Sequence, residues 1–156
     1  MHAYLLVLSV PGNSTDPAHP GWIELTQIKV ETALMSRRPP LVRVGGPNWS
    51  PHGPKPLHVN ALMEAGPHTF NLLLARASGK KFASVVLEVM KHVRGKSVVK
   101  HRIRMRDVQV ISYQIQDDPG LVKPLVHVFL APEEYRFEVG SALQMAVEHE
   151  RPHAAR

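Results

Sequence analysis

The chain has 156 residues, a net charge of +6 and 44% hydrophobic residues, which suits one globular domain with its own core. It contains no cysteine, so disulfides, thiolate catalysis and cysteine-ligated zinc are excluded. No apolar run approaches the roughly 18 residues of a membrane-spanning helix. The apolar first eight residues lack a basic leader and a cleavage site, and we interpret them as a first strand rather than a signal peptide.

Strand patterns dominate the first third of the chain. Residues 2–10 are rich in Leu and Val and end at a Pro-Gly pair, and a turn-rich loop over 13–21 follows. Residues 22–34 alternate with a period of two and carry apolar side chains in both rows. This pattern predicts a strand with two partly covered faces.

The segment 35–56 is the main irregular region. It holds six prolines and three glycines, which remove ladder donors and predict one long loop. A loop of this length exceeds the usual ceiling of about 12–15 residues, and such loops are commonly functional. Trp49 at its centre predicts that the loop packs on something, such as another subunit.

One helix and further strands are expected after this loop. Residues 57–63 form a predicted strand, and the helix runs over 68–77. In it Phe70, Leu73, Leu74 and Ala77 make an apolar stripe, which is most simply expected to face the core. Ser78-Gly79 ends the helix.

The remaining chain again has strand patterns. We expect strands over 81–92 and 98–115, the second with a possible bulge near Arg106-Asp107, and then strands over 125–130 and 135–139 that are separated at Pro132. About eight strands and one helix favour a mainly β barrel or sandwich. Residues 141–156 form a C-terminal tail.

The positive charge is concentrated between residues 80 and 106. This segment contains nine Lys or Arg and only one acidic residue, Glu88. Within this segment Lys100, Arg102, Arg104 and Arg106 alternate with apolar residues and His101, so they form a basic ladder on one strand face. Such a ladder could bind nucleic acid or another acidic ligand, line a pore, or be neutralised by acids on neighbouring strands or subunits. No aromatic residue lies between 83 and 112, which favours neutralisation over nucleic-acid binding.

The sequence offers little for catalysis. Its ten histidines include one HExxH spacing, from His149 to His153 in the C-terminal tail, but Pro152 lies inside it and opposes the helix that this motif needs. GxSxG, Walker and GxGxxG motifs are absent. We therefore expect a non-enzymatic protein with no metal and no cofactor. A small enzyme with a histidine-based site is the alternative, and loss of activity on metal chelation would identify it.

Four short sequence segments, taken in their order along the chain, resemble the Hcp family, the tube-forming proteins of the bacterial type VI secretion system. They are Gly21-Trp22-Ile23-Glu24-Leu25, the helix-to-strand phrase from Ala75 to Phe82, the phrase from Asp107 to Gln114, and Glu134-Tyr135-Arg136-Phe137-Glu138. The resemblance covers about residues 2–139. It implies a small closed β-barrel with one flanking helix over 1–140, similar to phage tail-tube proteins.

The resemblance also implies a function by assembly. Family members form six-membered rings that stack into a hollow tube, carry effectors, and work with the sheath and spike of the same apparatus. They are made in the bacterial cytoplasm and exported without a signal peptide or membrane insertion. The alternative is a basic β-barrel that binds nucleic acid.

Candidate contact residues follow from the same resemblance. The loop over 35–56 would reach the neighbouring ring, with Arg37, Arg38 and Trp49 as contacts. The helix would contact the next subunit in the ring, with candidate residues Phe70, Leu73 and Arg76. The basic ladder would line the lumen or bind an acidic partner. Two features depart from the family, namely the proline content of the loop and the basic segment itself.

Overall fold

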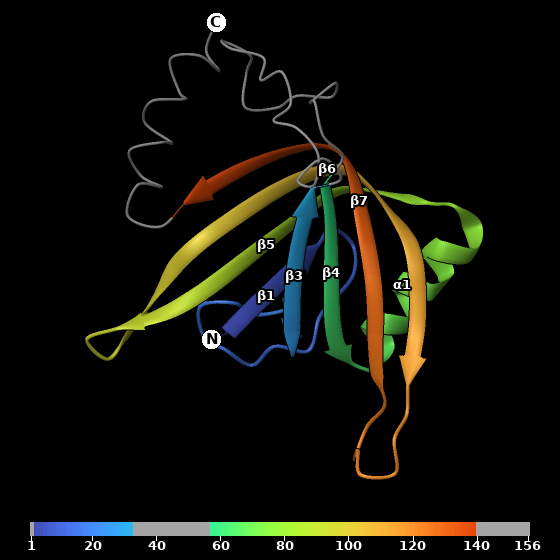
Figure 1. Cartoon of the computed structure of the whole chain (residues 1–156), viewed down its shortest axis with the longest axis horizontal. Coiled ribbons are helices and arrows are strands. Elements are labelled where there is room, and N and C mark those ends of the chain that lie inside the picture. The colour runs from blue at the N-terminus through green and yellow to red at the C-terminus, as the bar shows by residue number, and fades with distance from the viewer. Residues whose placement is uncertain (1, 33–56, 140–156) are drawn as a thin grey trace, which may run out of the picture.

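The computed structural model of the chain describes residues 2–32 and 57–139. The elements are β1 (His2–Val7), β2 (Ile23–Leu25), β3 (Gln27–Thr32), β4 (Leu57–Glu64), α1 (Pro67–Ser78), β5 (Lys81–Val93), β6 (Lys96–Gln116) and β7 (Leu125–Val139). The seven strands form one antiparallel sheet in the order β2-β1-β5-β6-β7-β4-β3, which curls strongly while α1 lies along one side (Figure 1). The predicted mainly β class with one flanking helix is confirmed.

The two ends of the strand order are joined by the chain itself. β2 and β3 stand at opposite ends of the sheet, yet only Thr26 separates them in sequence. The Thr26 N–H donates to the carbonyl oxygen of Leu62 in β4 at 2.7 Å. One extended segment therefore pairs with β1 at its start and with β4 beyond it, and this exchange curls the sheet back on itself.

The predicted break at Pro132 is wrong, because β7 is one strand of 15 residues. β4 pairs with β7 only as far as Leu130, and Pro132 pairs with Val108 of β6 on the other side. Beyond Leu130 β7 has no ladder on the β4 side within the described residues. A proline is tolerated at such an edge because no ladder hydrogen bond is lost there. Within the described residues the structure has seven strands, where about eight were expected.

The long strand has an unusual backbone conformation at Asp107, near the expected bulge, whereas its register with β7 shifts further on, between Val110 and Ser112. The φ of 51° at Asp107 falls in the left-handed region, which is uncommon for a residue other than glycine. Inward-facing side chains are Ile103 and Met105 before this point and Val108 and Val110 after it. The buried side chains of the strand thus switch from odd-numbered to even-numbered positions at Asp107. This switch lets one 21-residue strand contribute to the core on both sides of the bend.

The core fills the inside of the curl. Buried Leu, Val, Ile, Met and Phe side chains from every strand except β3 form one cluster, which Leu72 and Ala75 of α1 join. Leu5, Ile23, Leu87, Ile103 and Leu130 have no solvent exposure. No helix in the described residues is long and apolar enough to cross a membrane. The loop 35–56, with Arg37, Arg38 and Trp49, and the tail 141–156 lie outside the described residues.

Candidate assembly surfaces

The basic ladder is largely neutralised by glutamates on the flanking strands. Arg102 Nε lies 2.7 Å from Glu88 Oε2 of β5, and Arg104 Nε lies 2.9 Å from Glu138 Oε1 of β7. Further along, Arg106 Nη1 lies 3.5 Å from Glu134 Oε2. Antiparallel pairing explains this arrangement, because Arg102 stands between Glu88 and Glu138 in one row across the three strands.

These ion pairs favour neutralisation of the ladder by neighbouring strands. Glu138 is only 1% exposed and Glu88 only 8%, so both carboxylates need a cation beside them. The arginines that were candidates for an acidic ligand are therefore used within the sheet. Lys100 alone of the four makes no ion pair within residues 2–32 and 57–139, and it stands apart on the hairpin that joins β5 and β6.

A buried histidine extends the charged face into the loop before β2. His19 is 2% exposed; its Nδ1 lies 2.7 Å from Asp16 Oδ2 and its Nε2 lies 2.8 Å from Glu88 Oε1. The ring stacks on Tyr4 with centroids 4.1 Å apart. The chain Asp16–His19–Glu88–Arg102 thus ties the loop to β1, β5 and β6.

The pKa values of two groups beside this histidine are shifted, those of Asp16 and Tyr4. The hydrogen bond from His19 lowers the pKa of Asp16 below its ordinary value. Burial, with smaller contributions from the Asp16 and Glu24 carboxylates, raises the pKa of Tyr4. Sequence analysis missed this cluster. The Asp-x-x-His spacing is visible in the sequence, but Glu88 is 69 residues away, and only the fold brings the two parts together.

The apolar stripe of α1 does not face the core, so that expectation is wrong. Phe70 is 58% exposed, Leu73 36% and Leu74 50%, and Ala77 is exposed as well. The helix instead buries the adjacent row of side chains, which consists of His68, Thr69, Leu72 and Ala75. Both rows carry apolar residues at helical spacing, and periodicity alone cannot tell which of them meets the sheet.

The buried row is partly polar at its start, where it holds His68 and Thr69. Thr69 Oγ1 accepts from the N–H of Gly66 at 2.9 Å and donates to its carbonyl oxygen at 2.8 Å. The ring of His68 is hydrogen-bonded at Nε2 to the carbonyl oxygen of Glu64 at 3.0 Å, and burial lowers its pKa. The His68 contact ties the start of α1 to the end of β4, and Leu72 and Ala75 of the same row join the core cluster. The larger apolar side chains then remain on the outside, together with Arg76, which is also exposed.

Two grooves continue the exposed helix surface. One, of about 140 Å³, lies between α1 and the turn after β1 and is lined by Val10, Leu74, Ala75 and Phe82 among others. The second, of about 280 Å³, shares Val10 and runs along Leu6 and Leu8. Leu8 is itself 57% exposed. The groove beside α1 is also lined by Asn71, Ser78 and Lys80, so polar side chains lie among the apolar ones here.

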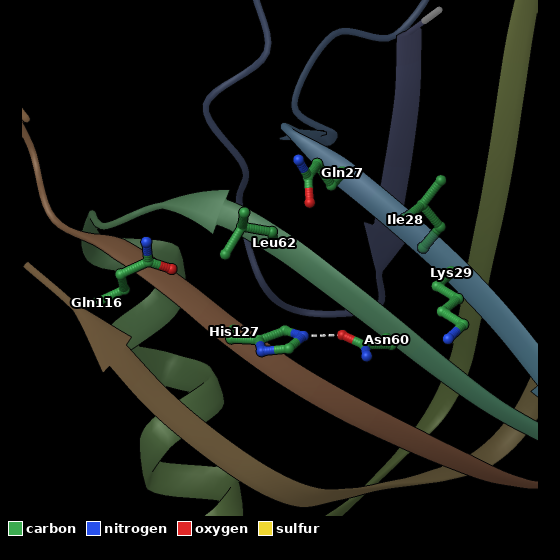
Figure 2. Close-up of a pocket in the computed structure, with 7 residues that line it drawn as sticks. All are labelled: Gln27, Ile28, Lys29, Asn60, Leu62, Gln116 and His127. Carbon is green, nitrogen blue, oxygen red and sulfur yellow. Dashed lines mark hydrogen bonds between the residues drawn. The ribbon is translucent and has the colours of Figure 1, made fainter.

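A polar pocket of about 240 Å³ lies on the face of β3, β4 and β7 that is turned away from the core. Figure 2 shows the amides of Gln27, Asn60 and Gln116 around it, with His127 pointing at Asn60, to which it is hydrogen-bonded. Within the part of the chain that the structure describes, no group of three His, Cys, Asp or Glu residues could hold a metal ion.

Comparison with known families gives one extensive match. The sequence matches the family described as "Type VI secretion system effector, Hcp" over residues 4–138. No curated protein matches the sequence.

Solved structures with the same fold are numerous. A structure titled "Structure of a type six secretion system protein" is 21% identical, with a TM-score of 0.69 over 88% of this chain and 83% of the other. Hcp1 from Salmonella typhimurium is 16% identical, with a TM-score of 0.68 over 88% and 85%. The secreted protein Hcp3 from Pseudomonas aeruginosa is 12% identical, with a TM-score of 0.63 over 90% and 92%. At these identities the likeness concerns the fold.

Proposed function

The chain belongs to the Hcp family of type VI secretion proteins, and on that basis we propose that it is a tube subunit that closes into six-membered rings. The observation that carries the proposal is the family match, which spans residues 4–138 and so includes every element of the curled sheet. Rings would stack into a hollow tube that carries effectors. The sheath and spike of the same apparatus would be its further partners.

The surface of α1 supports a role in self-association. Phe70, Leu73 and Leu74 place three large apolar side chains side by side on the outside of the helix, which is unfavourable in water unless a partner covers them. Cyclic rings are built from contacts between two different surfaces of neighbouring subunits. We propose that this helix surface, with Arg76 at its edge, is one of the two surfaces of the ring contact.

Nucleic-acid binding has little support in this geometry. Three of the four ladder cations are already paired with glutamates, and no aromatic side chain is interleaved with them in the sequence. The loop residues Arg37, Arg38 and Trp49 remain predicted contacts to the neighbouring ring. A tube protein acts by assembly and release, so we propose no catalytic step.

Secretion is the direct test of the tube role. The epitope-tagged chain is expressed in its bacterium, and the culture supernatant is compared between the parent strain and a strain that lacks the contractile sheath. We expect the chain outside the cell only when the sheath is present, with a cytosolic marker retained in both strains. Equal amounts outside both strains would contradict the proposal.

The ring contact has its own test. Leu74→Glu places a charge on the exposed row of α1 without touching the core, so the monomer should fold while the ring falls apart. Lys29→Glu, on the outer side of β3, is the matched control because Lys29 is also exposed. Rings that survive Leu74→Glu unchanged would exclude α1 from the contact.

A further inference from the structure

The hairpin between β5 and β6 carries positive charge that nothing neighbouring it neutralises. Lys91, Arg94, Lys96 and Lys100 are all exposed, and none of them makes an ion pair with a described residue. No acidic residue occurs between positions 89 and 101. In contrast to the arginines of the ladder, these cations are available to a partner.

The same hairpin exposes apolar side chains. Val93 is 42% exposed and Val98 37%. The two-residue turn has positive φ at both positions, 52° at Arg94 and 77° at Gly95, which is the turn whose twist matches a tight hairpin. The tip is thus held in one shape, with two valines among four cations, and it projects from the sheet (Figure 1).

The hairpin at the other end of β6 is acidic. Asp117 and Asp118 are exposed on the β6–β7 connection, and neither makes an ion pair within residues 2–32 and 57–139. Glu64 adds a third exposed acid, since it pairs with Leu125 where β7 begins. Lys123 is the one cation on this connection. The acidic hairpin also exposes Ile115 at 64% and Val122 at 99%.

We infer that the basic β5–β6 hairpin of one copy docks on the acidic β6–β7 hairpin of the next copy. The inference rests on the proposed function, because it supplies a head-to-tail contact for the assembly. The charges of the two hairpins are complementary, since cations on one would meet carboxylates on the other. Both hairpins also expose apolar side chains, which would be buried against each other in the contact. Opposite charges steer and align such surfaces, and apolar burial stabilises them.

A second copy fits better than an unrelated acidic partner. One chain carries both halves of the contact, at the two ends of a single 21-residue strand. A contact between two different surfaces of the same chain is heterologous and repeats from copy to copy. A polyanion such as nucleic acid would account for the basic hairpin, but it would leave the acidic hairpin and its fully exposed Val122 without a role.

Charge reversal tests the contact. Lys91→Glu with Lys96→Glu should raise the concentration at which assemblies appear in light scattering about ten-fold, and Asp117→Lys with Asp118→Lys should do the same. Combining all four changes restores opposite charges, so assembly should recover towards the wild-type value. Lys29→Glu reverses one exposed charge away from both hairpins and should have no effect. Failure of the fourfold variant to recover, with each double variant impaired and folded, would overturn the inference.

Disulfide cross-linking tests directly whether the two hairpins of neighbouring copies lie side by side. The chain has no cysteine of its own, so only introduced cysteines can form the cross-link. Lys96→Cys with Asp118→Cys should give a ladder of covalent multimers after oxidation of preformed assemblies, whereas Lys96→Cys with Lys29→Cys should not. A wild-type chain that assembles, together with a Lys96→Cys, Asp118→Cys variant that assembles but does not cross-link, would refute the hairpin contact alone. A wild-type chain that stays monomeric would refute the ring proposal itself. Binding of a single-stranded oligonucleotide that is lost in the basic-hairpin variant, with assembly unchanged, would assign the hairpin to a polyanion instead.

Discussion

Replacing Glu88 by glutamine tests whether the charged face holds the fold together. The carboxylate of Glu88 accepts from His19 at 2.8 Å and from Arg102 at 2.7 Å, and the residue is 8% exposed. Glutamine keeps the size but has one oxygen, so its NH2 group must face one of the two donors. Hydrogen bonds to charged groups contribute about 1.5–3 kcal/mol each, and breaking a buried pair costs about 3–5 kcal/mol.

Because Arg102 is partly exposed, we expect a loss of about 3 kcal/mol, at the lower end of that range. For a chain of this size that corresponds to a fall in Tm of about 6–12 °C. Urea unfolding followed by circular dichroism measures the loss of unfolding free energy. Glu133→Gln is the matched control, because Glu133 also pairs with a cation, Lys81 at 2.5 Å, but in an exposed position, and its midpoint should not separate from wild type. A Glu88→Gln variant as stable as this control would refute the reasoning.

Three further outcomes follow from the described residues. Gly12→Ala should lower Tm clearly, because a Cβ there would lie 2.2 Å from the backbone of Trp22, and thermal unfolding measures it. Leu87→Ala should cost about 2–5 kcal/mol in urea unfolding, since Leu87 has no solvent exposure. The pKa of Asp16 is lowered in the folded state, so its contribution to stability is present above its ordinary pKa and is lost as the pH falls through the folded-state value. Asp16→Asn should therefore flatten the fall of Tm below about pH 4, and an unchanged acid profile would contradict the contact with His19.

Local patterns predicted the elements of the fold well. Alternation fixed most strands, the Arg94-Gly95 pair fixed a hairpin, and the parity change at Asp107 fell where a bulge was expected. Pro132 misled because the effect of a proline depends on whether the strand has a neighbour on that side. That neighbour, β4, lies about 70 residues earlier in the chain, and its pairing with β7 ends at Leu130.

The candidate surfaces were harder to predict for the same physical reason. The alternation that placed Arg102 and Arg104 on one face was correct, but which acids would lie beside them depended on the strand order. The exposure of Phe70 and Leu74 depended on which row of the helix packs on the sheet, and that row is the one with Leu72 and Ala75. Sequence periodicity carries no information about such partners. The sequence does show that the turn at Arg94-Gly95 is rich in basic residues and that the turn at Asp117-Asp118 begins with two acidic ones.

The most direct test of the central claim is the mass of the wild-type chain in solution, measured by light scattering after gel filtration, with negative-stain images of the same peak. A ring of six copies of the 17.4 kDa chain predicts about 104 kDa and annular particles. A single peak at the mass of one chain, persisting at high protein concentration, would contradict the account.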